Sequence, residues 1–385
     1  MKRPAAGLAL LLVLAGASAA PEAGVFRDIT KASGIRMRVS GDLRRLKLIP
    51  TMIGGCAFGD YDGDGRPDLY VTNSVARWGK PNGHNCGRLF QNLGGGRFAD
   101  LTEKAGIRVC GLGMGAFWVD LDGDGKLDLY LTNVGPNVVY WNRGDGTFEE
   151  GKDTGLEDPL FSSGVGFLDY DGDGRVDVVV ANYLDTTPEW EAGQPQSEFR
   201  VPEDYVGQPS HLFHNEGGRK WRDVTRPAGL AIDQRETKTL GVAVLDYDGD
   251  GRPDLYFVND RVGNRLFENV IGSRKSWIRI EPRVSADQRI VLGTTVRVTA
   301  GGRTQTKTFW VSPSYVSGSL TDLHFGLGGA AAADRIEVVW ARRRHADVPK
   351  HCRSARLHDR AERAARCASW SAVLPLEAAL RRREK

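Results

Sequence analysis

The chain has 385 residues with 52 basic and 49 acidic side chains, which leave a formal net charge of +3. Residues 341–385 hold 13 basic and 5 acidic side chains, a balance of +8, so the rest of the chain carries −5. The overall charge therefore gives no ground for a nucleic-acid partner. The length suits one large β domain followed by a small one.

The first residues predict export. Lys2 and Arg3 precede an apolar run, and Ala17-Ser18-Ala19 matches an A-x-A cleavage site. We interpret residues 1–19 as a signal peptide, because the run is too short to span a bilayer comfortably and no later segment reaches that length. We expect a secreted or periplasmic protein with no membrane insertion.

One element stands alone near the N-terminus, FRDITKASGI at residues 26–35, and it returns after three of the four repeats described below. Its later copies are FADLTEKAGI at 98, FEEGKDTGL at 148 and WRDVTRPAGL at 221. The fourth repeat has no copy of its own. We therefore predict that the N-terminal segment supplies the outer strand of the last repeat.

The repeat itself occurs four times. An apolar strand with glycines leads into an aspartate loop, a short strand ending in Asn follows, and an L-F-x-N or V-Y-x-N strand closes the unit. Val, Leu, Phe and Tyr bounded by Gly, Asn and Asp are typical of strands. We predict an all-β fold: over residues 25–271, a small β-propeller of about four blades whose ring the N-terminal strand closes. An open stack of hairpins is the alternative.

Each aspartate loop obeys the pattern D-x-D-x-D-G-x-x-D. Alternate carboxylates on a tightly curled loop converge, the glycine permits the turn, and the next residue offers a backbone carbonyl. Such an all-oxygen cage suits Ca²⁺ better than Zn²⁺ or Mg²⁺. Plain Asp-Gly turn chemistry is the alternative. An EF-hand would place Glu at the twelfth position, which holds Val71, Leu131, Val180 and Phe257, so the ninth position must close the cage.

We predict about four Ca²⁺ ions in these loops. The predicted ligands of the first two loops are Asp60, Asp62, Asp64, Arg66 and Asp68, and Asp120, Asp122, Asp124, Lys126 and Asp128. Those of the last two are Asp169, Asp171, Asp173, Arg175 and Asp177, and Asp246, Asp248, Asp250, Arg252 and Asp254, where Arg and Lys would contribute backbone carbonyls.

Five cysteines occur in the chain: Cys56, Cys86, Cys110, Cys352 and Cys367. Their spacing fits no C-x-x-C metal pattern. In an oxidising compartment Cys86 could pair with Cys110, and Cys352 with Cys367, although the sequence does not assign the pairs. Cys56 lies in an apolar run and is predicted to be buried.

A polar insertion at residues 186–210 separates the third and fourth repeats. It has four prolines and no apolar period, which predicts a surface loop suited to binding. Its candidate carboxylates are Glu189, Glu191, Glu198, Glu203 and Asp204, and its candidate aromatic contacts are Trp190, Phe199 and Tyr205.

The repeated loops are similar to the FG-GAP, or VCBS, repeats of integrin α-type β-propellers. Residues 275–340 resemble the small ASPIC/UnbV β domain, in SWIRI at 276, LGTTVRVTAGGRTQTKTFW at 292, SYVSGSLTDLHFGLGG at 314 and DRIEVVW at 334. The resemblance implies a secreted protein similar to cartilage acidic protein. Such proteins usually carry more repeats, so an incomplete ring is a further alternative. After Trp340 the resemblance ends, and we interpret residues 341–385 as a basic tail that is disordered or frame-shifted.

No G-x-S-x-G, H-E-x-x-H or phosphate-binding glycine motif occurs. His211 and His214 are three apart on a predicted strand, so they point to opposite faces and make a poor chelating pair. We therefore expect an exported calcium-binding module for adhesion to an extracellular protein or glycan, and no enzyme. The alternatives are a polysaccharide lyase or hydrolase that uses the insertion, and calcium that serves the fold alone while the C-terminal domain binds the partner.

Overall fold

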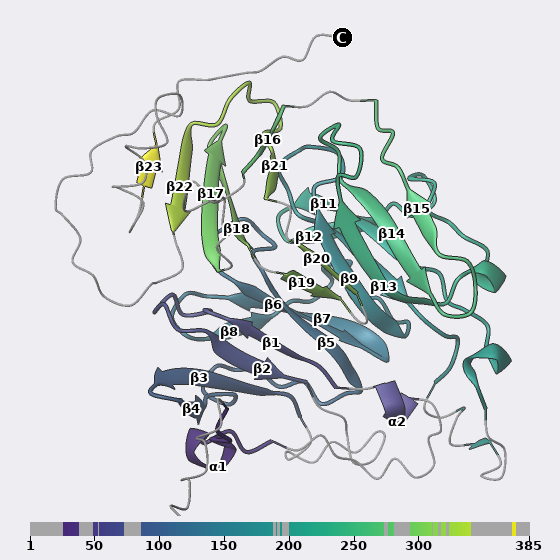
Figure 1. Ribbon diagram of the computed structural model, residues 1–385, viewed down its shortest axis with the longest axis horizontal. Helices are drawn as coiled ribbons and strands as arrows, with labels where there is room; N and C mark the ends of the chain where they lie inside the picture. The colour runs from purple at the N-terminus through teal and green to yellow at the C-terminus, as the bar shows by residue number, and fades with distance from the viewer. Residues whose placement is uncertain are drawn as a thin grey trace, which may run out of the picture.

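The computed structural model describes residues 26–37, 49–52, 54–72, 86–187, 190, 193–194, 200–272, 276–280, 293–309, 311–314, 317–320, 323–339 and 372–374. The predicted signal peptide, Cys352, Cys367 and most of the basic tail lie outside these ranges. Apart from three short helical turns and α1, the described part consists of strands and their connections (Figure 1). None of its helices is long and apolar enough to cross a membrane.

Four antiparallel sheets follow one another along the chain, and each pairs its strands in sequence order. Blade one holds β1 (Cys56–Gly59), β2 (Asp68–Val71), β3 (Arg88–Gly94) and β4 (Arg97–Asp100). Blade two holds β5 (Gly113–Val119), β6 (Asp128–Asn133), β7 (Gly135–Asn142) and β8 (Phe148–Glu150). Blade three holds β9 (Ser162–Leu168), β10 (Asp177–Asn182), β11 (His211–Gly217) and β12 (Lys220–Asp223). Blade four holds β13 (Thr239–Leu245), β14 (Asp254–Asn259) and β15 (Arg265–Phe267).

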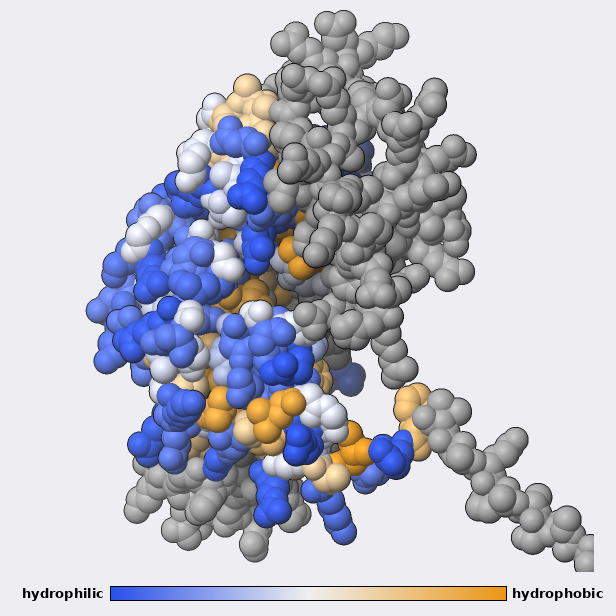
Figure 2. Space-filling view, turned by 90° about the vertical axis from the view of Figure 1, so that its left-hand side faces the viewer, coloured by the Kyte–Doolittle hydropathy of each residue, from blue (hydrophilic) through white to orange (hydrophobic). Residues whose placement is uncertain are grey.

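Apolar side chains fill the spaces between consecutive blades. Successive residues of a strand point to opposite faces, so a strand between two blades must be apolar on both. In β10, Val178 and Val180 pack toward blade two, whereas Val179 and Ala181 pack toward blade four. The surface shown in Figure 2 is mostly hydrophilic where it is coloured. The predicted all-β fold of propeller-type blades is confirmed.

The N-terminal segment does not close a ring. In the described part of the chain β15 pairs only with β14, and Phe26 is 95% exposed and belongs to no strand. Instead the segment forms α1 (Thr30–Ser33), which lies against β4 of blade one (Figure 1). The predicted outer strand of blade four is therefore wrong.

The reason lies in a turn that the N-terminal copy of this element shares with the copies after blades one and three. After blade one, Asp100 Oδ1 accepts a hydrogen bond from Thr102 N at 3.1 Å, and the turn that follows packs on β8 of the next blade. The N-terminal copy makes the same turn, with Asp28 Oδ1 accepting from Thr30 N at 2.8 Å. The turn after blade one packs on the blade that follows it in the sequence, and the N-terminal turn does the same. The blade that follows the N-terminal segment is blade one.

The cysteines differ in their environments. Cys86, at the start of β3, forms a disulfide with Cys110, in the connection between β4 and β5, with the Cα atoms 4.1 Å apart. Cys56 is exposed, so its predicted burial is wrong. Ala57 packs against blade two, and Cys56 therefore points to the face of blade one that looks away from it.

The C-terminal part forms the predicted small β domain. Within residues 275–340 it contains β16 (Trp277–Arg279), β17 (Thr294–Ala300), β18 (Arg303–Phe309), β19 (Val311–Ser314), β20 (Ser317–Leu320), β21 (His324–Gly326) and β22 (Arg335–Val339). A further strand, β23 (Ala372–Leu374), lies in the segment interpreted as a basic tail and pairs with β22. Val296, Val298, Phe309, Phe325 and Ile336 form the core of the domain. The β19–β20 hairpin lies along β13 of blade four, so this domain and the blades are in contact.

Candidate metal centres

Each aspartate loop connects the first two strands of its blade. In the loop of blade three, Gly172 and Gly174 have φ angles of +72° and +84°. Residues with a side chain rarely adopt this left-handed region, so both positions require glycine. The other three loops have the same pair of left-handed glycines. The loop therefore curls as the D-x-D-x-D-G spacing predicts.

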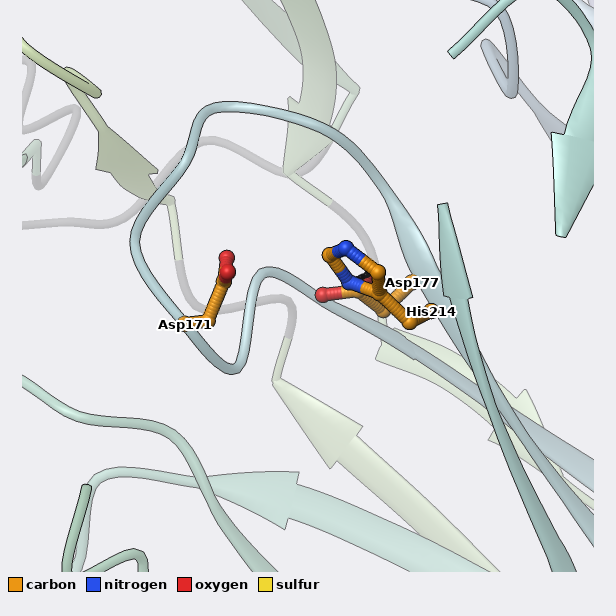
Figure 3. Close-up of side chains that lie close together, drawn as sticks. All are labelled: Asp171, Asp177 and His214. Atoms are coloured by element: carbon orange, nitrogen blue, oxygen red, sulfur yellow. Dashed lines mark ion pairs between the residues drawn. The ribbon is translucent and has the colours of Figure 1, made fainter. Parts of the chain in front are cut away.

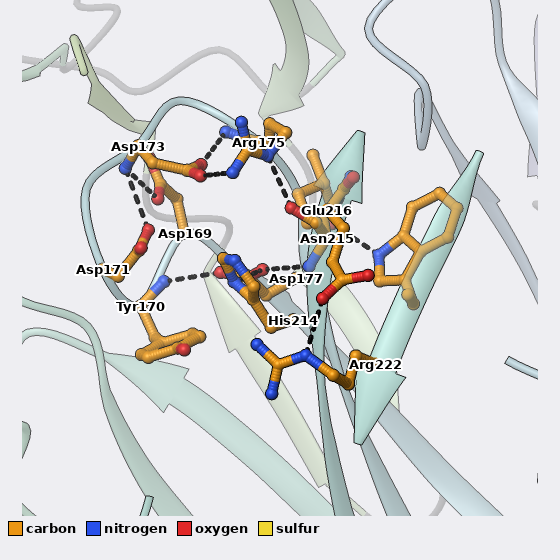
Figure 4. Close-up of polar contacts among 12 residues, drawn as sticks. Asp169, Tyr170, Asp171, Asp173, Arg175, Asp177, His214, Asn215, Glu216 and Arg222 are labelled. Atoms are coloured by element: carbon orange, nitrogen blue, oxygen red, sulfur yellow. Dashed lines mark hydrogen bonds and ion pairs between the residues drawn. The ribbon is translucent and has the colours of Figure 1, made fainter. Parts of the chain in front are cut away.

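Backbone N–H groups hold the carboxylates of the loop in place (Figure 4). Asp169 Oδ2 accepts from Gly174 N at 2.9 Å, and Asp171 Oδ1 accepts from Asp173 N at 3.0 Å. Asp177 is fully buried and accepts from the N–H groups of Tyr170 and Asn215 at 3.1 and 2.8 Å. The equivalent bonds recur in blade two, with Asp120, Asp122 and Asp128 as the acceptors.

Three ligand-type groups in each loop come together with oxygen or nitrogen atoms within 4.8 Å of one another. The carboxylate groups are Asp60, Asp62 and Asp68; Asp120, Asp122 and Asp128; Asp169, Asp171 and Asp173; and Asp246, Asp248 and Asp250. Four predicted aspartate ligands lie outside these carboxylate clusters: Asp64, Asp124, Asp177 and Asp254. Of these, Asp177 forms a separate cluster with Asp171 and His214. The side chains of Arg66, Lys126, Arg175 and Arg252 each form an ion pair with the third aspartate of their own loop.

Burial and crowding disfavour the ionised carboxylates. Burial, reinforced by neighbouring carboxylates, raises the pKa of Asp120 to about 7 and that of Asp128 to about 8. The pKa values of Asp68 and Asp169 are raised to about 7, again mainly by burial. In the loop of blade one, the buried Oδ1 of Asp60 accepts no hydrogen bond from the described residues. The negative charge of these clusters of carboxylate oxygens is only partly offset by neighbouring groups. The clusters therefore fit a hard divalent cation, which would offset that charge.

His214 lies at the loop of blade three and was not among the predicted site residues. Figure 3 shows its ring beside Asp177, with Nδ1 3.3 Å from Asp177 Oδ1, and Asp171 across the loop. The carboxylate of Asp177 raises the pKa of His214. His214 is the variable residue of L-F-x-N, and Gln91, at the same position of blade one, donates to Asp62 Oδ2 at 2.6 Å. The polar residue at this position of the repeat is the feature of the sequence from which His214 could have been predicted as a site residue.

The two histidines point to opposite faces of β11, as predicted. His211 Nδ1 lies 2.8 Å from Oδ2 of Asp158, whose side chain is fully buried, far from the loop.

The closing asparagine of L-F-x-N connects neighbouring loops. Asn142 Nδ2 donates to Leu127 O at 3.0 Å in its own blade and to Tyr61 O at 2.8 Å in the loop of blade one. Asn215 and Asn269 make the equivalent bonds to Leu121 O and Tyr170 O of the preceding loops. The loops of blades one, two and three are therefore each hydrogen-bonded to the blade that follows them in the chain.

The described part of the insertion offers aromatic and basic groups rather than paired free carboxylates. Glu203 forms an ion pair with Arg261, and Asp204 Oδ2 accepts from Val201 N at 2.9 Å. Trp190 is 40% exposed, and the Arg200 guanidinium lies 5.2 Å from its ring centre. The Tyr205 ring contacts Trp190 edge-on. The candidate residues Glu189, Glu191, Glu198 and Phe199 lie outside the described ranges.

Two solved structures show a distant similarity over about three quarters of the chain. One is a lectin of Agrocybe aegerita, described as recognising non-reducing terminal N-acetylglucosamine, with 15% identity and a TM-score of 0.30 over 76% of this chain and 71% of the lectin. The other is the V. cholerae biofilm matrix protein Bap1, with 10% identity and a TM-score of 0.29 over 77% of this chain and 64% of that one.

Curated relatives are more informative. Cartilage acidic protein 1 of Xenopus tropicalis is 26% identical over 305 residues, which cover 74% of this chain and 41% of the relative. The Mus musculus protein of the same name is 24% identical over 333 residues, covering 82% of this chain and 44% of the relative. The chain thus spans less than half of the length of the curated relatives it matches.

Two family models match in succession along the chain. The FG-GAP-like repeat matches residues 60–131 and 120–180, which contain the aspartate loops of blades one to three. The ASPIC and UnbV model matches residues 285–357, which include β17, β18 and β22. Neither these descriptions nor the names of the relatives denote an enzyme. The chain therefore contains FG-GAP-like repeats followed by an ASPIC and UnbV domain, and it is similar to cartilage acidic protein 1.

Proposed function

We propose that this protein is an exported module whose blades bind Ca²⁺ and whose surface binds a protein or glycan outside the cell. The observation that carries the proposal is that all four loops bring three carboxylates together, with oxygens within 4.8 Å of one another. The first and third aspartates take part in every loop, joined by the ninth residue in blades one and two and by the fifth in blades three and four. Oxygen-only ligands on a curled loop are the ligands that Ca²⁺ prefers. The raised pKa values of Asp120 and Asp128 support the same conclusion, because a cation would stabilise their ionised forms.

The sequence of residues 1–19 and the Cys86–Cys110 disulfide support export, since disulfides persist in oxidising compartments. A binding role is supported by the FG-GAP and ASPIC/UnbV matches and by the exposed Trp190 with its neighbouring Arg200, a pair suited to contact a sugar ring or a protein surface. The involvement of Glu203 and Asp204 in other contacts favours binding over glycan hydrolysis.

The test is metal content per chain, measured together with thermal unfolding of the full chain in EDTA and in millimolar Ca²⁺. We expect about four Ca²⁺ per chain and about 2.7 kcal/mol of stabilisation for each site at a hundredfold excess over its Kd. The double variant Asp120→Asn, Asp122→Asn should lose one ion and keep the others. Absence of bound Ca²⁺ together with an unchanged unfolding temperature would leave the loops as ordinary turns and refute the proposal.

A further inference from the structure

The C-terminal domain rests on the aspartate loops of blades two, three and four. At blade three, Gly328 N donates to Gly172 O at 3.1 Å and Arg303 Nη1 donates to Asp173 O at 3.2 Å. At blade four, the indole of Trp277 lies directly over Gly251. At blade two, Thr304 O of β18 lies 3.6 Å from the β-carbon position of Gly123, beside a cavity of about 150 Å³ lined by β18 and the loops of blades two and three.

The closest approach is at the loop of blade three. A β-carbon on Gly326 would overlap the Asp169 carboxylate and lie 2.8 Å from the Gly172 backbone. Glycine is therefore required there to bring β21 against the loop. The burial of the sixth loop residue follows the same contacts. Gly174 and Gly251 are buried, Gly125 in blade two is half-buried, and Gly65 in blade one is exposed. No described atom comes within 4 Å of the β-carbon positions of Gly63, in blade one, and Gly249, in blade four, so the described contact at blade four is made at Gly251 and Asp246 instead.

The domain contacts the backbone of the loops, so its docking depends on the conformation of that backbone. Its hydrogen bonds at blade three go to the backbone carbonyls of Gly172 and Asp173. The positions of these carbonyls depend on Asp169 and Asp171, which accept from Gly174 N and Asp173 N. A cation held by the same carboxylates would fix this backbone in one conformation. The surface on which the domain rests would then be fixed as well.

The charges across the interface favour docking both with and without a bound dication. The blade-three loop contains four aspartates and one arginine, a formal charge of −3, which a dication would change to −1. Arg303 contacts this loop, and Arg279 lies 3.7 Å from Asp246 in the loop of blade four. Because the loop stays negative, cation binding does not turn the attraction into repulsion.

We propose that the C-terminal domain acts as a cap that retains the cations of blades two to four, so that cation binding and domain docking strengthen each other while the blade-one site exchanges freely. The proposal rests on the calcium binding proposed above. Coupling between two sites is reciprocal: if the cation favours docking, docking must tighten cation binding by the same factor.

The test loads the full chain with Ca²⁺, mixes it rapidly with an excess of a fluorescent chelator, and counts the ions released in each kinetic phase. We expect one fast ion and a slower group. If docking slows release without changing the rate of binding, the release rates differ by the same factor as the affinities, roughly 5- to 150-fold. The double variant Asp60→Asn, Asp62→Asn should abolish the fast phase and leave the slow one.

Gly326→Ala should convert slow release into fast release. Gly329→Ala is the matched control, because no atom lies within 4 Å of its β-carbon position, and it should behave as the unmodified chain. Trp277→Ala provides a second test without added bulk, and should speed release from blade four alone. A variant that still binds and rapidly releases the ion of the blade-one site would thereby be shown to have folded.

Two failures are distinguishable. A chain that binds no Ca²⁺ would refute the calcium proposal itself. A chain that binds Ca²⁺ but releases all ions at one rate, or one whose slow phase survives both Gly326→Ala and Trp277→Ala, would overturn the cap and leave calcium binding intact.

Discussion

At the scale of single residues, the asparagine of L-F-x-N makes two kinds of bond that can be separated experimentally. Asn142 is buried and joins its own blade to the loop of blade one through Tyr61 O. Asn92, at the same position of blade one, donates to Pro67 O at 2.9 Å in its own blade. The pair differs mainly in the bond to a preceding loop.

We predict that Asn142→Ala lowers the free energy of unfolding more than Asn92→Ala does. The larger loss should be about 2 kcal/mol, because the buried carbonyls of Tyr61 and Leu127 lose a donor. Urea unfolding of both variants under saturating Ca²⁺ measures the difference. Equal losses would mean that the bond between blades contributes nothing measurable.

His211 provides a pH-dependent contribution at the residue scale. Burial lowers its pKa, but the hydrogen bond and charge of Asp158 more than offset this, so the pKa is raised overall. The folded state therefore binds this proton more tightly than the unfolded state does. The resulting stability is complete below the unfolded pKa of about 6.5 and is lost as pH rises through the higher folded value.

We predict that His211→Phe lowers the free energy of unfolding by about 2 kcal/mol near pH 6, because Asp158 loses a charged partner, and by less at alkaline pH. Urea unfolding across this range should be compared with the unmodified chain, both under saturating Ca²⁺, because the loop aspartates also have raised pKa values. A difference independent of pH would show that His211 only packs.

At the scale of elements, the Cys86–Cys110 disulfide ties the start of β3 to the connection that leads into blade two. The two residues are 24 positions apart. Closing a loop of this length restricts the unfolded chain and stabilises the folded one by about 3.5 kcal/mol in the chain-entropy description.

We predict that Cys86→Ser combined with Cys110→Ser lowers the free energy of unfolding by up to about 3.5 kcal/mol. Cys56→Ser is the control: Cys56 is exposed and free, so its replacement should change stability by less than about 0.5 kcal/mol. Unfolding curves with and without a reducing agent provide the measurement. A double variant as stable as the control would contradict the prediction.

The elements also show what the sequence could and could not predict. The strands and the curled loops followed from local patterns, because alternation of apolar residues and the D-x-D-x-D-G spacing act within a few residues. The position of the N-terminal segment depends on packing between blades, and it lies on blade one rather than pairing with β15. His214 escaped prediction because its proximity to Asp177 depends on the pairing of β10 with β11.

At the scale of the whole molecule, the C-terminal domain could not be positioned from the sequence. Its strands are recognisable from SWIRI and DRIEVVW, but nothing local indicates that Gly326 and Gly328 face the loop of blade three. Such contacts join residues more than a hundred positions apart, and they depend on the shapes of two finished surfaces.

The three apolar clusters between blades each join a blade to the one that follows it in the chain. These contacts resemble those of a one-dimensional array, in which stability is a sum of unit terms and interface terms. A fourth cluster departs from this pattern, because it brings together Met114 of blade two, Tyr183 of blade three and Leu240 of blade four. An interior unit shares two interfaces and a terminal unit only one. Inserting a further unit would therefore add one interface between blades, but it would also alter the apolar cluster and the C-terminal contacts that span several blades.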